Sequence, residues 1–379
     1  MLSALKQALW EELEAKKPLR RFRSGWISGV LALFLGLAGL AGVLCLRYPE
    51  LLTTPELRAA LNVSIINTLL YIVFIVAFLL ALISLLLRQN KLLGFSALAV
   101  TLAAITMASY FAQHPNTASQ HAPVYFGLDW FVLNLTLTGL LFLPLERLFR
   151  RCEQSVFRFE WREDLLYFLI SSVMVQSLTF LSMLPSTLIA ANTSLTSVQT
   201  FFANLPFLVA LLAVMLFTDL VQYWVHRLFH QIPFLWRFHA VHHSAQTLDW
   251  LAGSRMHIIE IIVLRGLTVI PMSVLGFEQA VIYSYLLLVY LYSTYIHANV
   301  RFDIEWLKPI IVTPRYHHWH HGIEKEAIDV NFAIHFPFID RLFGTYYMPK
   351  GQWPTGYGVG GHPVPSGYIR QFLYPFTKR

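Results

Sequence analysis

Long apolar runs dominate the pattern of hydrophobic and polar positions along the chain. Each run is about 20 residues or more, which is enough for a helix to cross a hydrocarbon core of roughly 30 Å. The predicted spans are residues 26–46, 64–87, 92–112, 125–144, 165–190 and 202–225, followed by 258–275 and 279–296. Only Gly276-Phe277-Glu278 separates the last two, so they should form a hairpin that either crosses the bilayer or dips into it. The pattern predicts an all-α, multi-pass transmembrane bundle.

The composition agrees with a membrane protein. Of the 379 residues, 56% are hydrophobic and only 13% are charged, whereas about a quarter of the residues of a soluble domain are charged. The net charge of +7 comes from basic residues beside the apolar runs, where lipid headgroups and topology account for them, so a nucleic-acid partner is not predicted. The two cysteines, Cys45 and Cys152, lie far apart and indicate neither a disulfide framework nor a thiolate metal site.

Four regions follow from the pattern. Residues 1–25 form a basic amphipathic segment that should lie on the membrane surface, and no cleavable signal peptide is expected there. Residues 26–200 carry spans to which the sequence assigns no role. Residues 201–350 hold most of the histidines, and 351–379 form a proline-rich tail. The more polar stretch from residue 298 onward is expected to pack as a cap on the spans.

The loops between the spans predict the orientation of the bundle. The N-terminal segment, the turn at 88–91 and the loop at 145–164 are basic, whereas the loops at 113–124 and 191–201 contain no Lys or Arg. The basic set is expected in the cytoplasm. If every span crosses, the histidine-rich cap and the N-terminus both lie on the cytoplasmic side, in a plasma or inner membrane or in the endoplasmic reticulum, depending on the organism.

Eleven of the fifteen histidines fall between residues 226 and 321. Nine of these eleven form an HxxxH cluster, two HxxHH clusters and one isolated histidine at the end of an apolar run. On a helix, positions i, i+3 and i+4 share a face, so each cluster can present its imidazoles to one metal or to adjacent metals. The candidate ligands are His226, His230, His239, His242, His243, His297, His317, His320 and His321. Nine imidazoles exceed the positions around one ion, which predicts two metals.

Other residues near the clusters are candidates for supporting roles. Asp219 and Tyr223 lie seven and three residues before His226 on the same helical stripe. A carboxylate within a span is costly and usually functional, so Asp219 is predicted to accept the second N–H of a ligand histidine. His257 and His318 are candidates for support or for an extra ligand, although His318 lies off the shared face. His335 is expected to be structural, and no role is assigned to His114, His121 and His362.

The residues alone leave the identity of the metal open. Imidazole suits Zn, Cu, Fe and Ni alike. The Glu-x-x-His pairs of soluble di-iron bundles do not occur here, and neither does the HExxH of zinc proteases. A histidine-lined metal transporter or sensor without redox chemistry therefore remains an alternative to a metal enzyme.

Three segments resemble the fatty acid hydroxylase and sterol desaturase superfamily. Asp219 to His230 reads DLVQYWVHRLFH, Thr313 to Gly322 reads TPRYHHWHHG, and Asp340 to Tyr347 reads DRLFGTYY. The resemblance covers about residues 215–350 and makes 201–350 the catalytic domain. It implies that the nine histidines hold two non-haem irons. It also implies O2-dependent oxidation of a C–H bond in a lipid, sterol or fatty acyl substrate, by hydroxylation, desaturation or ether cleavage.

The chain departs from this family at one position. Hydroxylases of the family often offer a tenth histidine four residues past the position of His297, and here that residue is Arg301. Asn299 is the candidate substitute, directly or through a water. The sequence contains neither a haem-attachment motif nor a strand–GxGxxG–helix motif for a dinucleotide. An external electron donor, in the form of a separate electron-transfer protein, is therefore expected.

Overall fold

A computed structural model gives the fold of the chain. It describes residues 2–15, 20, 23–60, 62–114, 124–192, 195–302, 304–360 and 363–377. Among these residues the regular structure is helical, with no β-strand, as predicted. Lys16, Lys17 and Arg21 of the predicted surface segment, together with His121 and His362, lie outside the described residues.

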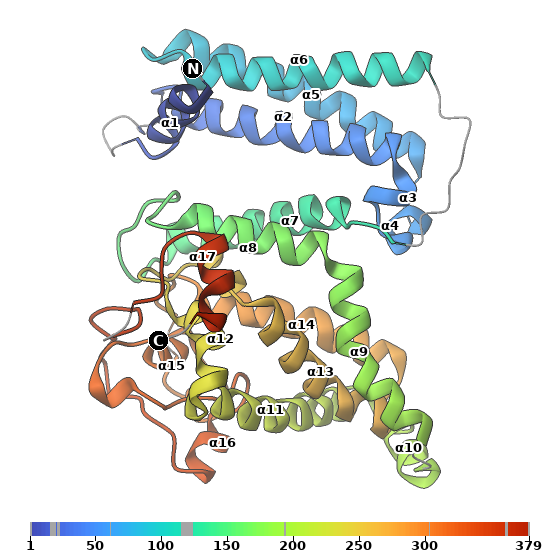
Figure 1. Cartoon of the computed structure of the whole chain (residues 1–379), viewed down its shortest axis with the longest axis vertical. Helices are drawn as coiled ribbons and strands as arrows, with labels where there is room; N and C mark the ends of the chain where they lie inside the picture. The colour runs from blue at the N-terminus through green and yellow to red at the C-terminus, as the bar shows by residue number, and fades with distance from the viewer. Residues whose placement is uncertain are drawn as a thin grey trace. The chain divides into compact units, whose positions relative to one another are not determined.

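The predicted spans correspond closely to observed helices (Figure 1). Within the described part of the chain, seven helices are long and apolar enough to cross a membrane, which confirms the multi-pass fold. They are α2 (Trp26–Arg47), α5 (Val63–Leu87), α6 (Leu92–Gln113), α7 (Leu128–Leu148), α11 (Phe207–Gln231), α13 (Ile258–Leu275) and α14 (Gln279–His297).

The predicted span at 165–190 is not one straight helix. It consists of α8 (Trp161–Val173) and α9 (Val175–Asn192), which are bent by 67° with respect to each other. The bend contains neither proline nor glycine. Instead, the Val173 carbonyl accepts a hydrogen bond from the Gly127 N–H at 3.0 Å, and the Gln176 side chain accepts one from the Tyr125 N–H. The first of these tertiary bonds satisfies a carbonyl that a straight helix would have bonded internally.

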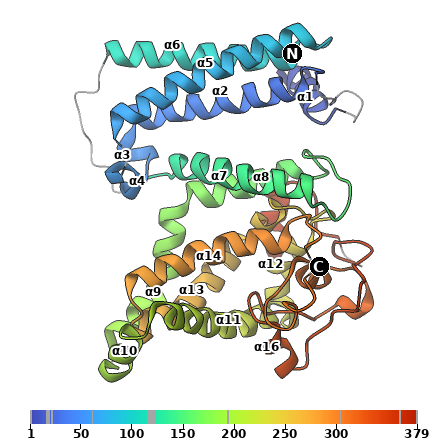
Figure 2. The same ribbon diagram turned by 180° about the vertical axis from the view of Figure 1, so that it is seen from behind.

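The chain divides into two compact units. The first comprises Met1–Thr136 with Ser172–Gln176 and contains α1 (Leu2–Leu13), α3 (Pro49–Leu52) and α4 (Pro55–Ala60) besides α2, α5 and α6. The three long helices pack side by side (Figure 2). Their close approach depends on small residues, because a Cβ atom on Gly39 would lie 2.5 Å from the Phe74 ring.

The second unit comprises Leu137–Ser171 and Ser177–Arg379. Besides α11, α13 and α14 it contains α10 (Thr196–Ala203), α12 (Pro233–His243), α15 (Pro314–His320), α16 (Pro337–Leu342) and α17 (Tyr368–Leu373). The end of α7 and most of α8 and α9 belong to this unit, which therefore begins before the predicted boundary at residue 200.

The helices of the second unit give it two distinct ends. At one end, Gly276 adopts φ 77° and closes the α13–α14 hairpin, and the Gln199 side chain of α10 donates to the Val274 carbonyl. At the other end, the backbone after α7 pairs with the backbone after α14, where Arg151 N–H donates to the Asn299 carbonyl at 3.1 Å. The C-terminal tail packs on α12 at this second end, through Tyr368 and Tyr374.

Candidate metal centre

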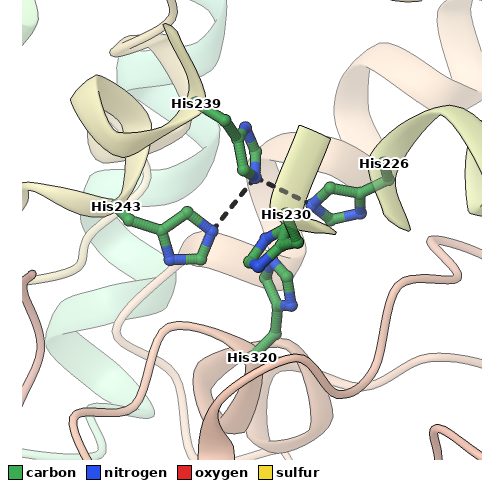
Figure 3. Close-up of side chains that lie close together, drawn as sticks. All are labelled: His226, His230, His239, His243 and His320. Atoms are coloured by element: carbon green, nitrogen blue, oxygen red, sulfur yellow. Dashed lines mark hydrogen bonds between the residues drawn. The ribbon is translucent and has the colours of Figure 1, made fainter. Parts of the chain in front are cut away.

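The structure brings the nine predicted ligands together in two groups. Within each group, one ligand atom from every residue lies within 4.8 Å of the others. The first group contains His226, His230, His239, His243 and His320, and the second contains His242, His297, His317 and His321. Figure 3 shows the first group with its rings directed toward a common centre. Each group could hold one metal ion, and the ligand count predicts two.

Each HxxHH cluster divides its histidines between the two groups. In α12, His239 and His243 belong to the first group and His242 to the second. At α15 the assignment is reversed, because the i and i+4 residues join the second group and His320 joins the first. Viewed along a helix axis, the side chain four residues further on points about 40° to one side of the first side chain. The side chain three residues further on points about 60° to the other side. The two short helices therefore lie between the groups and contribute to both.

Proline fixes where both short helices begin. Pro233 occupies the first turn of α12 directly after α11 ends, and Pro314 occupies the first turn of α15. Proline has no N–H to lose there and its fixed φ favours a helical start. The Thr313 hydroxyl also caps α15 by accepting from the Tyr316 N–H. These local signals set the register in which the histidines face the two groups.

Most of the imidazoles are oriented by a hydrogen bond at Nδ1. In the first group, His226 donates to the Phe332 carbonyl, His320 to the Val330 carbonyl and His239 to the Glu260 carboxylate. In the second group, His242 donates to the Arg255 carbonyl and His297 to the Ser293 carbonyl. A carbonyl oxygen can only accept, so Nδ1 carries the proton and Nε2 presents its lone pair to the group.

The spacing of the Nε2 atoms indicates a cation between them. His226 and His239 approach each other at 3.0 Å through Nε2, and His242 and His297 do so at 3.2 Å. Nδ1 holds the proton in His242 and His297 because both bond backbone carbonyls, so their facing Nε2 lone pairs would repel each other. Two imidazole nitrogens bound at about 2.1 Å on adjacent positions of one ion lie about 3 Å apart. The residues therefore fit a metal ion in each group.

Burial keeps the imidazoles outside the spans neutral. It lowers the pKa of His239, His242 and His243 well below the usual value of 6.5. Burial has the same effect on the pKa of the three ligands at α15, with neighbouring histidine rings as a further cause. At neutral pH these rings hold one proton each, which leaves a nitrogen free to bind a metal.

Sequence reasoning missed the carboxylate that supports the first group. Glu260 lies at the start of α13, is 1% exposed, and accepts a 2.6 Å hydrogen bond from His239 Nδ1. Its place in an otherwise apolar run was a signal that could have been used. His257 caps the same helix by accepting from the Ile259 N–H, so it helps to position Glu260 and contacts no ligand group itself.

Asp219 has partners other than the predicted histidine. It is fully buried, and its two oxygens accept hydrogen bonds from the backbone N–H groups of Ile334, His335 and Phe336 at 2.8–3.1 Å. The expected bond to a ligand histidine is therefore corrected. The carboxylate fixes a chain segment whose nearby Phe332 carbonyl orients His226.

The remaining predicted supporting residues also contact the scaffold rather than a metal group. The Tyr223 hydroxyl bonds Thr345 and Arg227. His318 pairs with the Tyr357 hydroxyl and, through Nε2, with the His297 carbonyl. His335 lies against Tyr285 and Tyr292.

Asn299, the candidate substitute for a tenth histidine, has hydrogen-bond partners elsewhere. Its side-chain amide bonds both the N–H and the carbonyl of Cys152. Its role as a metal ligand, directly or through a water, stays a prediction.

Comparisons with known proteins agree with this geometry. Residues 211–345 match the family model described as fatty acid hydroxylase, close to the 215–350 expected from the motifs. The chain is 32% identical over 157 residues to an ornithine lipid hydroxylase, OlsE, of Rhizobium tropici, covering 41% of this chain and 47% of the relative. It is 29% identical over 146 residues to the alkylglycerol monooxygenase of Homo sapiens, covering 38% and 32% of the two chains.

A third relative is a very-long-chain aldehyde decarbonylase of Oryza sativa, 26% identical over 137 residues, with 36% of this chain and 45% of the relative aligned. The matches thus span between a third and a half of these relatives. No solved structure matches the chain significantly. The family model spans all nine histidines of the two groups. Residues 211–345 are therefore similar to a fatty acid hydroxylase domain, in agreement with the resemblance of the motifs.

Proposed function

We propose that the chain is an integral-membrane di-iron oxygenase that uses O2 to oxidise a C–H bond of a lipid. One observation carries the proposal. Two groups of imidazoles lie in the segment that matches the fatty acid hydroxylase family, and their Nε2 atoms point inward. Both groups lie at one end of helices long enough to span a membrane. Imidazole ligands do not select iron over zinc or copper. The choice of iron rests on the family.

The named relatives support a lipid substrate. By their names they act on an ornithine lipid, an alkylglycerol and a very-long-chain aldehyde. These molecules share long aliphatic chains and differ in their polar groups. We therefore propose a lipid with a long chain as substrate, and hydroxylation as the reaction, with desaturation or ether cleavage as the other outcomes for this chemistry.

The protein and the irons have different tasks in this proposal. When bound, two irons supply the oxidising power for an aliphatic C–H bond, which no side chain can provide. The chain itself orients the imidazoles through Glu260 and backbone carbonyls and keeps their rings buried. His226 lies in the last two turns of α11 and His297 ends α14, and both helices are long and apolar. A lipid chain can therefore reach the site without leaving a hydrophobic environment.

We further propose that the metal centre faces the cytoplasm. In the second unit, the backbone at Phe149 and Arg151 pairs with that at Asn299 and Arg301 through hydrogen bonds of 2.8 and 3.1 Å. The basic 145–164 loop is therefore adjacent to the end of α14 and its ligand His297. Basic loops favour the cytoplasmic side, and this adjacency holds however the bent α8–α9 pair crosses. A separate cytoplasmic electron-transfer protein would then supply the electrons.

The test is a lipid comparison under labelled oxygen. Cells that produce the protein are grown under 18O2, and their extracted lipids are compared by mass with those of cells that produce the His321→Ala variant. We expect a lipid that gains one labelled oxygen atom only with the wild-type protein. Loss of two hydrogens without the label would indicate desaturation instead. Identical lipids, combined with uptake of metal ions into proteoliposomes, would replace the proposal with a metal transporter.

A further inference from the structure

The second metal group is held by a short loop that connects α12 to α13. The Arg255 carbonyl in this loop accepts the Nδ1–H of His242 at 3.0 Å. Gly253 of the same loop faces His297 so closely that a Cβ atom there would lie 3.0 Å from its Nδ1. Two of the four ligands of the second group therefore depend on where residues 249–255 lie.

The far end of this loop is anchored by a buried ion pair. The Arg255 side chain is fully buried, and its Nε donates to Asp164, which is also fully buried, at 2.5 Å. Its Nη1 donates to Glu160 at 2.8 Å. Because the guanidinium is rigid and planar, two carboxylates fix both its position and its direction. They thereby fix the backbone of Arg255, whose carbonyl orients His242.

The near end of the loop is anchored to the same segment. Arg158 bonds both Asp164 and Asp249, the latter at 2.6 Å. Asp249 in turn accepts from the N–H groups of Leu251 and Ala252, at 3.0 and 3.1 Å. The 158–164 segment thus holds both ends of the loop through one connected set of charges.

A further buried carboxylate holds the His297 side of the group. Glu146 Oε1, near the end of α7, accepts from the Asn299 N–H at 2.8 Å and from the Trp250 N–H at 2.7 Å. This single oxygen ties the chain just after His297 to the start of the loop that supports His242. Among the described residues, no such hydrogen bond joins Glu146 or the 158–164 segment to an imidazole of the first group.

The two groups therefore differ in the origin of their support. The first group is oriented by Glu260, Val330 and Phe332, all within the matched segment 211–345. Glu146, Arg158 and Asp164 lie upstream of that segment. Burying such charges costs free energy that well-packed apolar residues would avoid, so stability alone does not explain them.

We propose that Glu146, Arg158 and Asp164 are positioning residues for the second metal group, so that its affinity depends on sequence outside the fatty acid hydroxylase domain. The inference rests on the proposed two-metal centre. Disturbing the anchor changes the direction of His242 and His297 and leaves the ligands of the first group in place. The result is a selective loss of one of the two ions.

The test is a Co2+ titration of the full-length protein, stripped of metal by chelation and held in lipid nanodiscs. We expect the wild type to bind two ions per chain. Asp164→Asn should bind one with wild-type affinity and the other about 10–100-fold more weakly, the range for lost support of a ligand. The absorption spectrum of its single tight Co2+ should match that of His321→Ala, which lacks a ligand of the second group.

Two matched variants sharpen the test. Glu260→Gln removes support from the first group, so it should weaken the other ion and leave a different residual spectrum. Glu12→Gln breaks the ion pair to Arg88 in the first unit and should leave both ions unaffected. If Asp164→Asn does not fold, Arg255→Lys replaces it in the titration. Lysine keeps the positive charge, but its single ammonium group cannot bond Asp164 and Glu160 at the same time in the way that the guanidinium does. Circular dichroism and thermal unfolding report folding in each case.

The outcomes separate this inference from the proposed function. Wild-type affinity for both ions in folded Asp164→Asn and Arg255→Lys would overturn the positioning role, and so would an equal weakening of both ions. A wild type that fails to bind two ions would overturn the two-metal centre itself, together with this inference.

Discussion

Replacing His242 with alanine should abolish the proposed lipid oxidation and leave the bundle folded. His242 is one of only four imidazoles in the second group, and its Nε2 lies 3.2 Å from that of His297. Loss of a partner that merely supports a ligand costs about 10–100-fold. Loss of the ligand itself should therefore lower product formation by at least about a hundredfold, measured as oxidised lipid per amount of membrane-inserted protein.

His114→Ala is the matched control for this prediction. His114 is exposed directly after α6, and its bonds to the described residues join it to its own helix and to Arg47. We expect wild-type activity and metal content for this variant. Full activity of His242→Ala, at normal expression, would exclude His242 as a ligand.

The largest effect on stability is expected from Asp219→Ala. The change removes the acceptor of three backbone N–H groups at residues 334–336. A buried donor left without a partner costs about 1–3 kcal/mol, so the variant should lose several kcal/mol of unfolding free energy. The first metal ion should also bind more weakly, because the segment that carries the Phe332 carbonyl is released from α11. Thermal unfolding in detergent and metal analysis measure the two effects.

Two further variants serve as comparisons for the loss of stability in Asp219→Ala. Asp219→Asn keeps one oxygen acceptor and should be destabilised less than the alanine variant. Asp329→Asn changes a half-exposed carboxylate that contacts His230 at 3.2 Å and should alter stability by less than about 1 kcal/mol. An unfolding temperature of Asp219→Ala equal to that of the wild type would contradict the structural role given to this carboxylate.

The spans and the grouped histidines could be predicted from the sequence because both are local patterns. Apolar length identifies the spans whatever their partners, and histidine spacing identifies helical faces. The bend between α8 and α9 was not predictable in this way. It depends on hydrogen bonds from Tyr125 and Gly127, which are about 50 residues away and carry no signal near Met174.

The supporting contacts show the same limit. Asp219 was identified as functional because a carboxylate within a span is costly, but its partners lie more than 110 residues later in the chain. The pairing of Glu260 with His239 requires a loop of about 15 residues to fold back, which spacing cannot reveal. The division of each HxxHH cluster between two groups likewise depends on where α12 and α15 lie, although the clusters themselves were evident.

The most direct test of the central claim is the anomalous scattering of iron in crystals of the full-length protein grown with iron. The account predicts two iron peaks per chain. One should lie among His226, His230, His239, His243 and His320, and the other among His242, His297, His317 and His321. A single peak, or peaks away from these nine imidazoles in a protein that still oxidises its lipid, would contradict it.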